Sequence, residues 1–232
     1  YSFKVKKKDE KKVNLLYSFS RLIREVKPTI ISMENVPQLM DFNESSIFQD
    51  FCNELTEMGY NYSYSVVFCP DYGIPQRRRR LVLLASKLGE ISILPKTHTP
   101  DNYVTVRDVI SSLPPIESGE ICVTDPLHRA RQLSPLNIKR IQATKEGGSW
   151  RDWPDELVLD CFKKDSGRTY GSVYGRMKWN EPAPTMTTQC TGLGNGRFGH
   201  PEQDRAISLR EAAIFQTFPE NYQFAEHNNV LN

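Results

Sequence analysis

The chain has 232 residues, of which 38% are hydrophobic and 25% are charged. This balance is typical of a soluble globular protein and excludes collagen, a disordered tail and a coiled coil. No apolar run approaches the roughly 20 residues that a transmembrane helix needs, which excludes an integral membrane protein. Because 30 basic and 28 acidic side chains leave a net charge of only +2, any nucleic-acid-binding signal must be local.

The cysteines and lysines give weaker information. The five cysteines are odd in number and irregularly spaced, without a Cys-x-x-Cys pair. This pattern favours a reducing, cytoplasmic compartment and argues against a disulfide framework or a metal site. Lysines crowd the stretch from Lys4 to Lys12, and a solvated arm is the simpler interpretation of that stretch.

The first part of the chain alternates helices and strands. Apolar residues recur at helical spacing from Leu15 to Val26 and stop before Pro28, so a helix is predicted there. A turn at 71–75 then leads to an apolar run suited to a strand covered on both faces. That apolar strand is 81–85. Between the first helix and the turn, the predicted elements are a strand at 29–33 that ends at Glu34, a helix at 47–58 before Gly59, and an alternating strand at 62–68. Such an order predicts an α/β fold, whose ligands bind at the carboxyl ends of strands.

From about residue 91 the composition of the chain changes: prolines become frequent, and the hydrophobic periodicity fades. The range 91–200 is interpreted as a second, irregular unit, since its aromatic residues are too apolar for a disordered segment. Ser134 can cap a helix that runs towards Gly147, and 155–164 could form another. Ser208 and Glu211 form a capping-box pair at the start of the last helix, which is predicted to end at Pro219.

Two segments carry residues suited to chemistry. Glu34 closes a strand, and partial burial there would favour the protonated carboxyl group that a proton donor needs, although a structural or surface glutamate is about equally common. Four consecutive arginines occupy 77–80. If the strand begins within this run, alternation puts Arg78 and Arg80 on one side, where their guanidinium groups suit phosphate and carbonyl oxygens. The alternative is an arginine-rich edge that keeps the protein soluble.

A third segment, 179–201, combines threonines, glycines and one arginine. Thr185, Thr187 and Arg197 allow close backbone approach and short polar contacts, as groove recognition requires. A plain glycine loop explains these residues nearly as well. The last helix, 205–219, is interpreted as a packing element without a catalytic role.

In this order and spacing, the segments resemble the DNA cytosine-5 methyltransferase family. The Glu-Asn-Val at 34–36 resembles its proton-donor motif, the run 76–80 resembles its Gln-x-Arg-x-Arg motif, and 205–219 resembles its late Arg-Glu-Ala-x-x-x-Gln-x-Phe-Pro motif. Residues 147–153 and 181–185 are similar to segments of the target-recognition region of bacterial enzymes. The resemblance covers roughly residues 13–225.

The resemblance implies a fold and its division. We expect the later part of a Rossmann-like, S-adenosylmethionine-dependent methyltransferase sheet together with an irregular target-recognition region. The expected parts are a partial catalytic domain at 1–90, the target-recognition region at 91–200, and a late-motif helix with a truncated tail at 201–232.

The resemblance also implies roles for single residues. A cysteine of the family adds to C6 of a cytosine that is flipped out of double-stranded DNA, and the methyl group then passes from S-adenosylmethionine to C5. Glu34 matches the acid that protonates N3, Arg80 the arginine that contacts O2, and Arg78 the one that supports the flipped nucleotide. Leu15 aligns with the wall of the cofactor pocket. The remaining expected contributors are Asn35 and Gln76 as structural support and Thr185, Thr187 and Arg197 as DNA-binding residues.

Three motifs of the family are not found in this sequence: the glycine-rich cofactor motif, the Pro-Cys-Gln nucleophile motif and the final Gly-Asn-x-Val-Pro motif. Cys69 is followed by proline, the reverse of the Pro-Cys order, Cys190 lies in the recognition loop, and Cys52 is expected in the core. We therefore expect the carboxyl-terminal portion of such an enzyme, inactive alone, which needs an amino-terminal half or a separate subunit. Self-association through an exposed sheet edge is also expected.

Two alternatives stay open at this point. One is a non-catalytic DNA-binding module that retains only the recognition region. The other is methylation of transfer RNA by the same chemistry, although a long second unit favours a reader of duplex DNA. For the DNA enzyme, a restriction-modification role and another methylation role both stay open, and a bacterial cytosol or nucleoid is the expected location.

Overall fold

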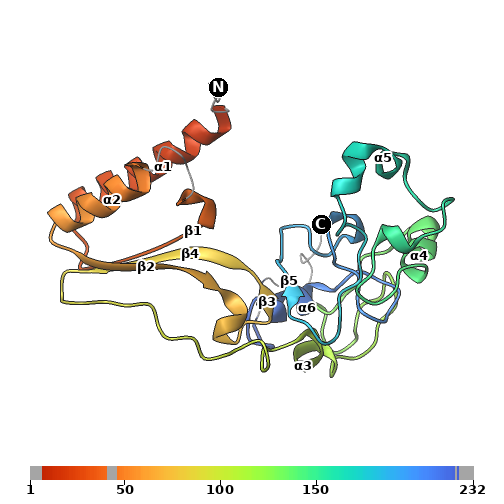
Figure 1. Ribbon diagram of the computed structural model, residues 1–232. Coiled ribbons are helices and arrows are strands. Elements are labelled where there is room, and N and C mark those ends of the chain that lie inside the picture. The colour runs from red at the N-terminus through yellow and green to blue at the C-terminus, as the bar shows by residue number, and fades with distance from the viewer. Residues whose placement is uncertain (1–6, 41–45, 223, 225–232) are drawn as a thin grey trace. The chain divides into compact units, whose positions relative to one another are not determined.

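The computed structural model describes residues 7–40, 46–222 and 224, and it falls into two compact units (Figure 1). Unit 1 combines Tyr1–Phe68 with Arg79–Lys96, and unit 2 combines Cys69–Arg78 with Thr97–Asn232. The first lysines of the predicted arm and the tail from 225 lie outside the described residues, whereas 7–12 form the first turns of a helix. The division into catalytic, recognition and late-motif parts stays a prediction.

Unit 1 contains the two helices that the apolar spacing predicted, α1 (Lys7–Val26) and α2 (Ser46–Glu57). α2 ends at a glycine because Gly59 has a φ of +81°, a conformation that side chains disfavour, and Tyr60 N–H then bonds the Leu55 carbonyl at 2.9 Å. The apolar stripe of α1 is wider than the face that packs. Leu16 is buried in the core, whereas Leu15 is 70% exposed.

The sheet of unit 1 has the order β1-β4-β2, and the central strand runs antiparallel to both neighbours. The strands are β1 (Ile30–Asn35), β2 (Asn61–Phe68) and β4 (Arg79–Ser86). Figure 1 shows α1 and α2 on the same side of this sheet, where Leu81 and Leu83 are fully buried. On the opposite side, Ile30 is 56% exposed. The prediction that 81–85 is covered on both faces is therefore wrong for the described residues of unit 1, because both helices pack on one face. Self-association through the sheet stays a prediction.

Unit 2 is mostly irregular, as expected, with short helices and a two-residue parallel ladder. Ser134 caps its longest helix as predicted, but that helix ends well before Gly147. The predicted helix at 155–164 is reduced to one turn. The elements are β3 (Gln76–Arg77), β5 (Ala183–Pro184), α3 (Val106–Ile110), α4 (Pro135–Gln142), α5 (Asp160–Lys163) and α6 (Leu209–Phe215). Among the described residues of both units, the 3-10 helices are Pro37–Leu39, Cys69–Tyr72, Trp150–Asp152, Asp165–Thr169 and Leu193–Asn195.

A buried ionic network anchors α6. The predicted capping box is confirmed, with Ser208 and Glu211 exchanging side-chain bonds to backbone N–H groups. Glu211 also accepts two bonds of 2.8 Å from the guanidinium of Arg205, and both residues are 1% exposed. His200 lies beside them, with its Nε2 3.9 Å from a Glu211 oxygen. The late segment is therefore held by charges inside unit 2, and α6 ends at Phe215, earlier than the predicted Pro219.

The protonation of His200 predicts acid sensitivity. Burial lowers its pKa to about 4, and its Nδ1 accepts backbone N–H bonds from Glu202 and Gln203, which a protonated Nδ1 could not accept. The unfolded chain, with an ordinary pKa of about 6.5, binds more protons than the folded chain between these values. The contribution of His200 to stability is thus complete above about pH 6.5 and falls by about 3 kcal/mol as the pH drops to 4. Urea unfolding across this range measures the loss. His200→Gln should flatten the dependence relative to the parent chain, and equal slopes in both would contradict the assignment.

Candidate active site

The register of the sheet in unit 1 brings the predicted acid and one predicted arginine together. Glu34 of β1 lies opposite Val82 of β4, and Arg80 lies two residues earlier on the same face. Long side chains reach such diagonal neighbours. The Arg80 Nε atom lies 2.6 Å from the Glu34 Oε1 atom, and the same guanidinium donates a 2.7 Å bond to the carbonyl of Arg79. The two functional groups are therefore adjacent and oriented.

This ion pair is only partly shielded from solvent. The side chain of Arg80 is 23% exposed and that of Glu34 is 54% exposed, more than expected for the end of a buried strand. Both side chains are exposed to this degree because they lie on the face of the sheet that no helix of unit 1 covers among the described residues. A pair so exposed contributes less than about 1 kcal/mol to stability, so folding alone does not require these two residues.

A hollow of about 670 Å³ in unit 1 has Glu34 in its wall. Leu15 lines the same hollow, so the structure brings together the predicted acid and the predicted cofactor-contacting residue. Asn35 also lines it, and its side-chain oxygen accepts a 2.8 Å bond from the N–H of Val36 at the end of β1. The volume lies within the usual range for small-molecule sites. The full lining is Leu15, Leu16, Phe19, Ser32, Met33, Glu34, Asn35, Val36, Gln38 and Leu39.

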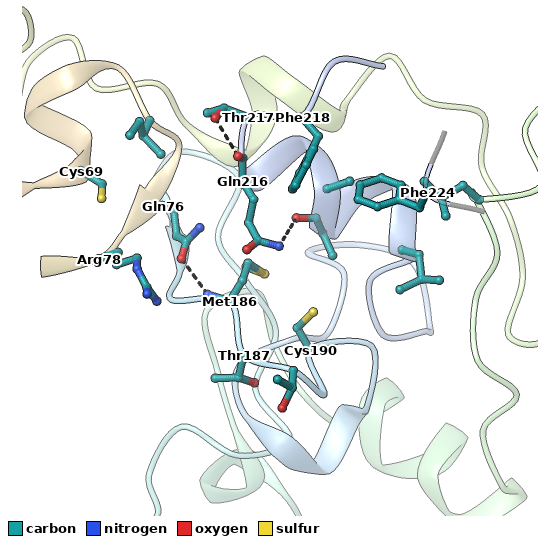
Figure 2. A pocket seen from close by; sticks show the side chains of 16 residues that line it. Cys69, Gln76, Arg78, Met186, Thr187, Cys190, Gln216, Thr217, Phe218 and Phe224 are labelled. Atoms are coloured by element: carbon teal, nitrogen blue, oxygen red, sulfur yellow. Dashed lines mark hydrogen bonds between the residues drawn. The ribbon is translucent and has the colours of Figure 1, made fainter. Parts of the chain in front are cut away.

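A second hollow, of about 870 Å³, lies in unit 2 and contains three further predicted residues, Gln76, Arg78 and Thr187. Figure 2 shows Gln76 and Thr187 on its wall together with Met186, with Arg78 beside them. Gln76 is buried, donates a 3.2 Å bond to the carbonyl of Phe215 and accepts a 2.9 Å bond from the N–H of Met186. It thereby joins β3 to the end of α6 and to the 183–188 segment.

The arginine run does not form one continuous strand. β3 ends at Arg77 and β4 begins at Arg79, so Arg78 lies between them and outside both ladders. The period-two alternation that predicted a shared side for Arg78 and Arg80 therefore does not apply, and the two residues belong to different units. Four consecutive arginines gave no sequence signal for the break between β3 and β4.

Two predicted DNA-binding residues make bonds within unit 2. Thr185 donates a 2.8 Å bond to the carbonyl of Arg77. The guanidinium of Arg197 donates to the carbonyls of Gly147 and Gly148, and to that of Arg176 at 3.2 Å. These contacts hold loops together, and a DNA-binding role for both residues stays a prediction.

The five cysteines are free thiols. Burial raises the pKa of Cys52 to about 11 and also raises the pKa of Cys190, which keeps both thiols protonated and poorly nucleophilic at neutral pH. A hydrogen bond with Thr124 lowers the pKa of Cys122, but this buried thiol lines neither of the two hollows described above. Cys69 and Cys190 line the hollow of unit 2.

Across residues 7–40, 46–222 and 224, no three His, Cys, Asp or Glu side chains are grouped so as to hold a metal ion. No helix within the same ranges combines the length and the apolar character needed to cross a bilayer.

Comparison with known proteins identifies the family. The profile of the C-5 cytosine-specific DNA methylase family matches residues 2–232. The chain is 60% identical to the type II methylase M.HgiDII of Herpetosiphon aurantiacus, covering 94% of the chain and 62% of that protein. It is 31% identical to the type II methyltransferase M1.BsuMI of Bacillus subtilis, covering 91% and 48%. The chain thus spans less than two thirds of these relatives.

A solved structure gives the fold. A prophage-encoded protein of E. coli, described as a DNA modification methyltransferase, superimposes with a TM-score of 0.63 at 21% identity, over 89% of this chain and 64% of that one. This likeness bears on the fold alone, and it agrees with the predicted methyltransferase-type α/β sheet followed by an irregular region. With the profile match over nearly its whole length, the chain belongs to the C-5 cytosine-specific DNA methylase family.

Proposed function

We propose that this chain supplies the acid and arginine side of a site that methylates C5 of a cytosine flipped out of double-stranded DNA. The observation that carries the proposal is the 2.6 Å contact between Glu34 and Arg80. The N3 and O2 atoms of cytosine belong to neighbouring ring positions, so a carboxyl and a guanidinium group must be adjacent to address both. The contact between these two side chains supplies that adjacency.

The proposed roles follow from the chemistry of the ring. A nucleophile that adds to C6 pushes negative charge towards N3 and O2. Glu34 donates a proton to N3, and Arg80 donates hydrogen bonds to O2, so the charge does not accumulate. Arg78 supports the extruded nucleotide, and Gln76 and Asn35 position their neighbours. Extrusion is needed because stacking covers the ring face from which C5 and C6 are approached.

The hollow of unit 1 suits part of a cofactor site. Its wall combines apolar side chains such as Leu15 and Phe19 with the polar Ser32 and Asn35 and the carboxylate of Glu34. Such a lining fits a ligand that has an aromatic base, polar groups and a positive charge, as S-adenosylmethionine does. When bound, S-adenosylmethionine supplies an electrophilic methyl group. Leu15 would contact its apolar portion.

We further propose that 91–200 recognises the DNA target, with Thr185, Thr187 and Arg197 near the duplex, and that 1–90 and 201–232 belong to the catalytic part. The type II bacterial relatives support a restriction-modification role in a bacterial cytosol or nucleoid. The loops of unit 2 support a role in DNA recognition. Side-chain hydrogen bonds, rather than long helices, hold these loops in place.

The proposal predicts that the 232-residue chain alone does not methylate DNA. None of its cysteines lies in a Pro-Cys-Gln motif. Adding a polypeptide that carries this motif and the glycine-rich cofactor motif should give transfer of labelled methyl from S-adenosylmethionine to duplex DNA. The matched control is the same mixture with the cysteine of the added polypeptide replaced by alanine. Incorporation by the chain alone, or none by a folded complex, would contradict the proposal.

A further inference from the structure

A small cavity in unit 2 gathers cationic side chains that the family motifs do not specify. It has a volume of about 310 Å³ and lies at the β3–β5 ladder, which pairs Arg77 with Pro184 and so brings Arg77 near Glu181. Arg77 is one of the two positions that Gln-x-Arg-x-Arg leaves open. The lining residues are Arg77, Gly147, Met177, Lys178, Glu181, Pro182, Pro184 and Arg197.

One carboxylate bridges two of these cations. Glu181 Oε2 lies 2.8 Å from a terminal nitrogen of Arg77, and its Oε1 lies 2.6 Å from Lys178 Nζ. The hydrogen bond from Lys178 is the main cause that lowers the pKa of Glu181, so the carboxylate is ionised at neutral pH. Each oxygen faces a different cation. The two oxygens of a phosphodiester could make the same pair of contacts.

The backbone beneath the cavity holds Lys178 in place. Gly147 has a φ of +71°, and a Cβ atom added there would lie 2.5 Å from the Lys178 Cε atom, so the lysine stem lies directly on the glycine. Arg197 donates bonds to the carbonyls of Gly147 and Gly148 and so fixes this floor. A cation that is already ordered loses less conformational entropy when it binds a ligand.

The lining of the cavity carries more positive than negative side chains. Three cationic side chains and one carboxylate line the cavity. Two more carboxylates lie nearby without lining the cavity: Glu146 accepts the N–H of Trp179 at 2.7 Å, and Asp152 accepts that of Ser149 at 2.9 Å. The side chains of Arg77 and Lys178 are 55% and 51% exposed, so a ligand can reach them.

We propose that Arg77 and Lys178 bind one phosphodiester of the DNA backbone, and that Glu181 occupies the anion position when DNA is absent. The inference rests on the proposed function, which makes DNA the substrate, and it adds a contact that is independent of base sequence. Binding would require Glu181 to release one or both cations. The site would therefore contribute to register on the duplex rather than to target choice.

Binding of a fluorescent DNA duplex to the full 232-residue chain, measured over a range of salt concentrations, tests this site. Replacing both cations (Arg77→Gln with Lys178→Gln) should weaken binding about 3- to 10-fold at physiological salt and reduce the salt slope by about 0.9. Both changes should be equal for duplexes of unrelated sequence. The matched control is Lys163→Gln, which removes one half-exposed lysine of unit 2 outside the cavity and should change little.

Glu181→Gln separates a stand-in anion from a structural link. Removing the competing carboxylate should tighten duplex binding about two- to five-fold at low salt. Weaker binding by this variant would overturn the stand-in role, and unchanged affinity and slope in the double variant would overturn the site. Thermal unfolding checks that each variant folds, and Lys178→Gln alone serves if the double variant does not.

Inorganic phosphate distinguishes the two sources of the ligand. At matched ionic strength, phosphate should compete only weakly with the duplex. If phosphate stabilises the chain through Arg77 and Lys178 while duplex binding ignores both residues, the site binds free phosphate and the DNA inference fails. Methyl transfer by the complemented enzyme is measured separately. Loss of transfer with intact binding at this site would contradict the proposed function and leave the phosphodiester site standing.

Discussion

Replacing Glu34 with glutamine is expected to slow methyl transfer by the complemented enzyme by about 10²- to 10⁴-fold, the usual contribution of a positioned general acid. The amide can donate a hydrogen bond to N3 but cannot deliver a proton, so charge would build up in the ring as the nucleophile adds to C6. The change also removes the charge that faces the Arg80 guanidinium at 2.6 Å. Single-turnover incorporation of labelled methyl measures the effect on chemistry separately from product release.

The control must remove a similar glutamate without touching the site. Glu25 in α1 is 56% exposed, against 54% for Glu34, and it also pairs with an arginine, Arg21, at 3.3 Å. Glu25→Gln should leave the rate unchanged. Stability should be nearly unchanged in both variants, because exposed pairs contribute less than about 1 kcal/mol.

Glu34→Gln and a second variant, Arg80→Lys, test the proposed enzyme against a non-catalytic DNA-binding module. Glu34→Gln should bind duplex DNA as the parent chain does while losing activity. Arg80→Lys keeps the charge but removes the planar fork, and it should weaken engagement of the flipped base. Unchanged methylation rates in both variants would refute the role assignment. Salt-dependent duplex binding by the chain, with no methyl transfer by a folded complemented complex, would instead favour the binding module.

Local capping signals in the sequence predicted two helix starts and one helix end, although the ends predicted at Gly147 and Pro219 were wrong. Gly59 ends α2, Ser134 caps α4, and the Ser208–Glu211 box starts α6, because each of these features depends on neighbours within a few residues. α3 was missed although Thr105 and Asp108 form the same kind of box. Its five residues are too few to show a helical period.

Tertiary packing decided the cases in which the sequence misled. Residues 155–164 have helical composition, yet Leu157, Val158 and Leu159 pack on the cluster of Trp150, Trp153 and Phe162, and only one helical turn remains. The exposed face of the sheet has a similar origin. The apolar run at 81–85 indicates burial, but which face is covered depends on where the helices pack.

The candidate site was predicted from motif resemblance rather than from spacing. The resemblance named both Glu34 and Arg80, whereas their contact depends on an antiparallel register that the sequence did not reveal. Glu181 and Arg77 went unnoticed as a pair because 104 positions separate them in the chain. A parallel ladder of two residues brings them together, and a ladder so short leaves no periodic signal.

Replacing Glu211 with glutamine is expected to destabilise unit 2 by about 3 to 5 kcal/mol, the usual cost of leaving one member of a buried ion pair without its partner. Glu211 and Arg205 are each 1% exposed and joined by two 2.8 Å bonds. Although burial opposes ionisation, the bonds from Arg205 lower the pKa of Glu211, so the carboxylate is charged at neutral pH. The amide leaves the guanidinium buried without a counter-charge.

Tryptophan fluorescence can follow this loss in unit 2 alone, because the three tryptophans, Trp150, Trp153 and Trp179, all lie there. Urea unfolding followed by fluorescence should show an earlier midpoint in Glu211→Gln. The matched control is Asp160→Asn, which breaks an exposed pair with Lys163 in the same unit and should leave the midpoint unchanged.

A double variant separates the charge from the packing. Arg205→Met with Glu211→Leu removes both charges and should recover much of the loss, because apolar residues of similar volume often replace a buried ion pair at little cost. Glu211→Gln as stable as the parent would contradict the account, since the guanidinium would then be satisfied without its carboxylate. If the double variant is instead as unstable as Glu211→Gln, the bond that Glu211 accepts from the N–H of Ser208, rather than the ion pair, holds the start of α6.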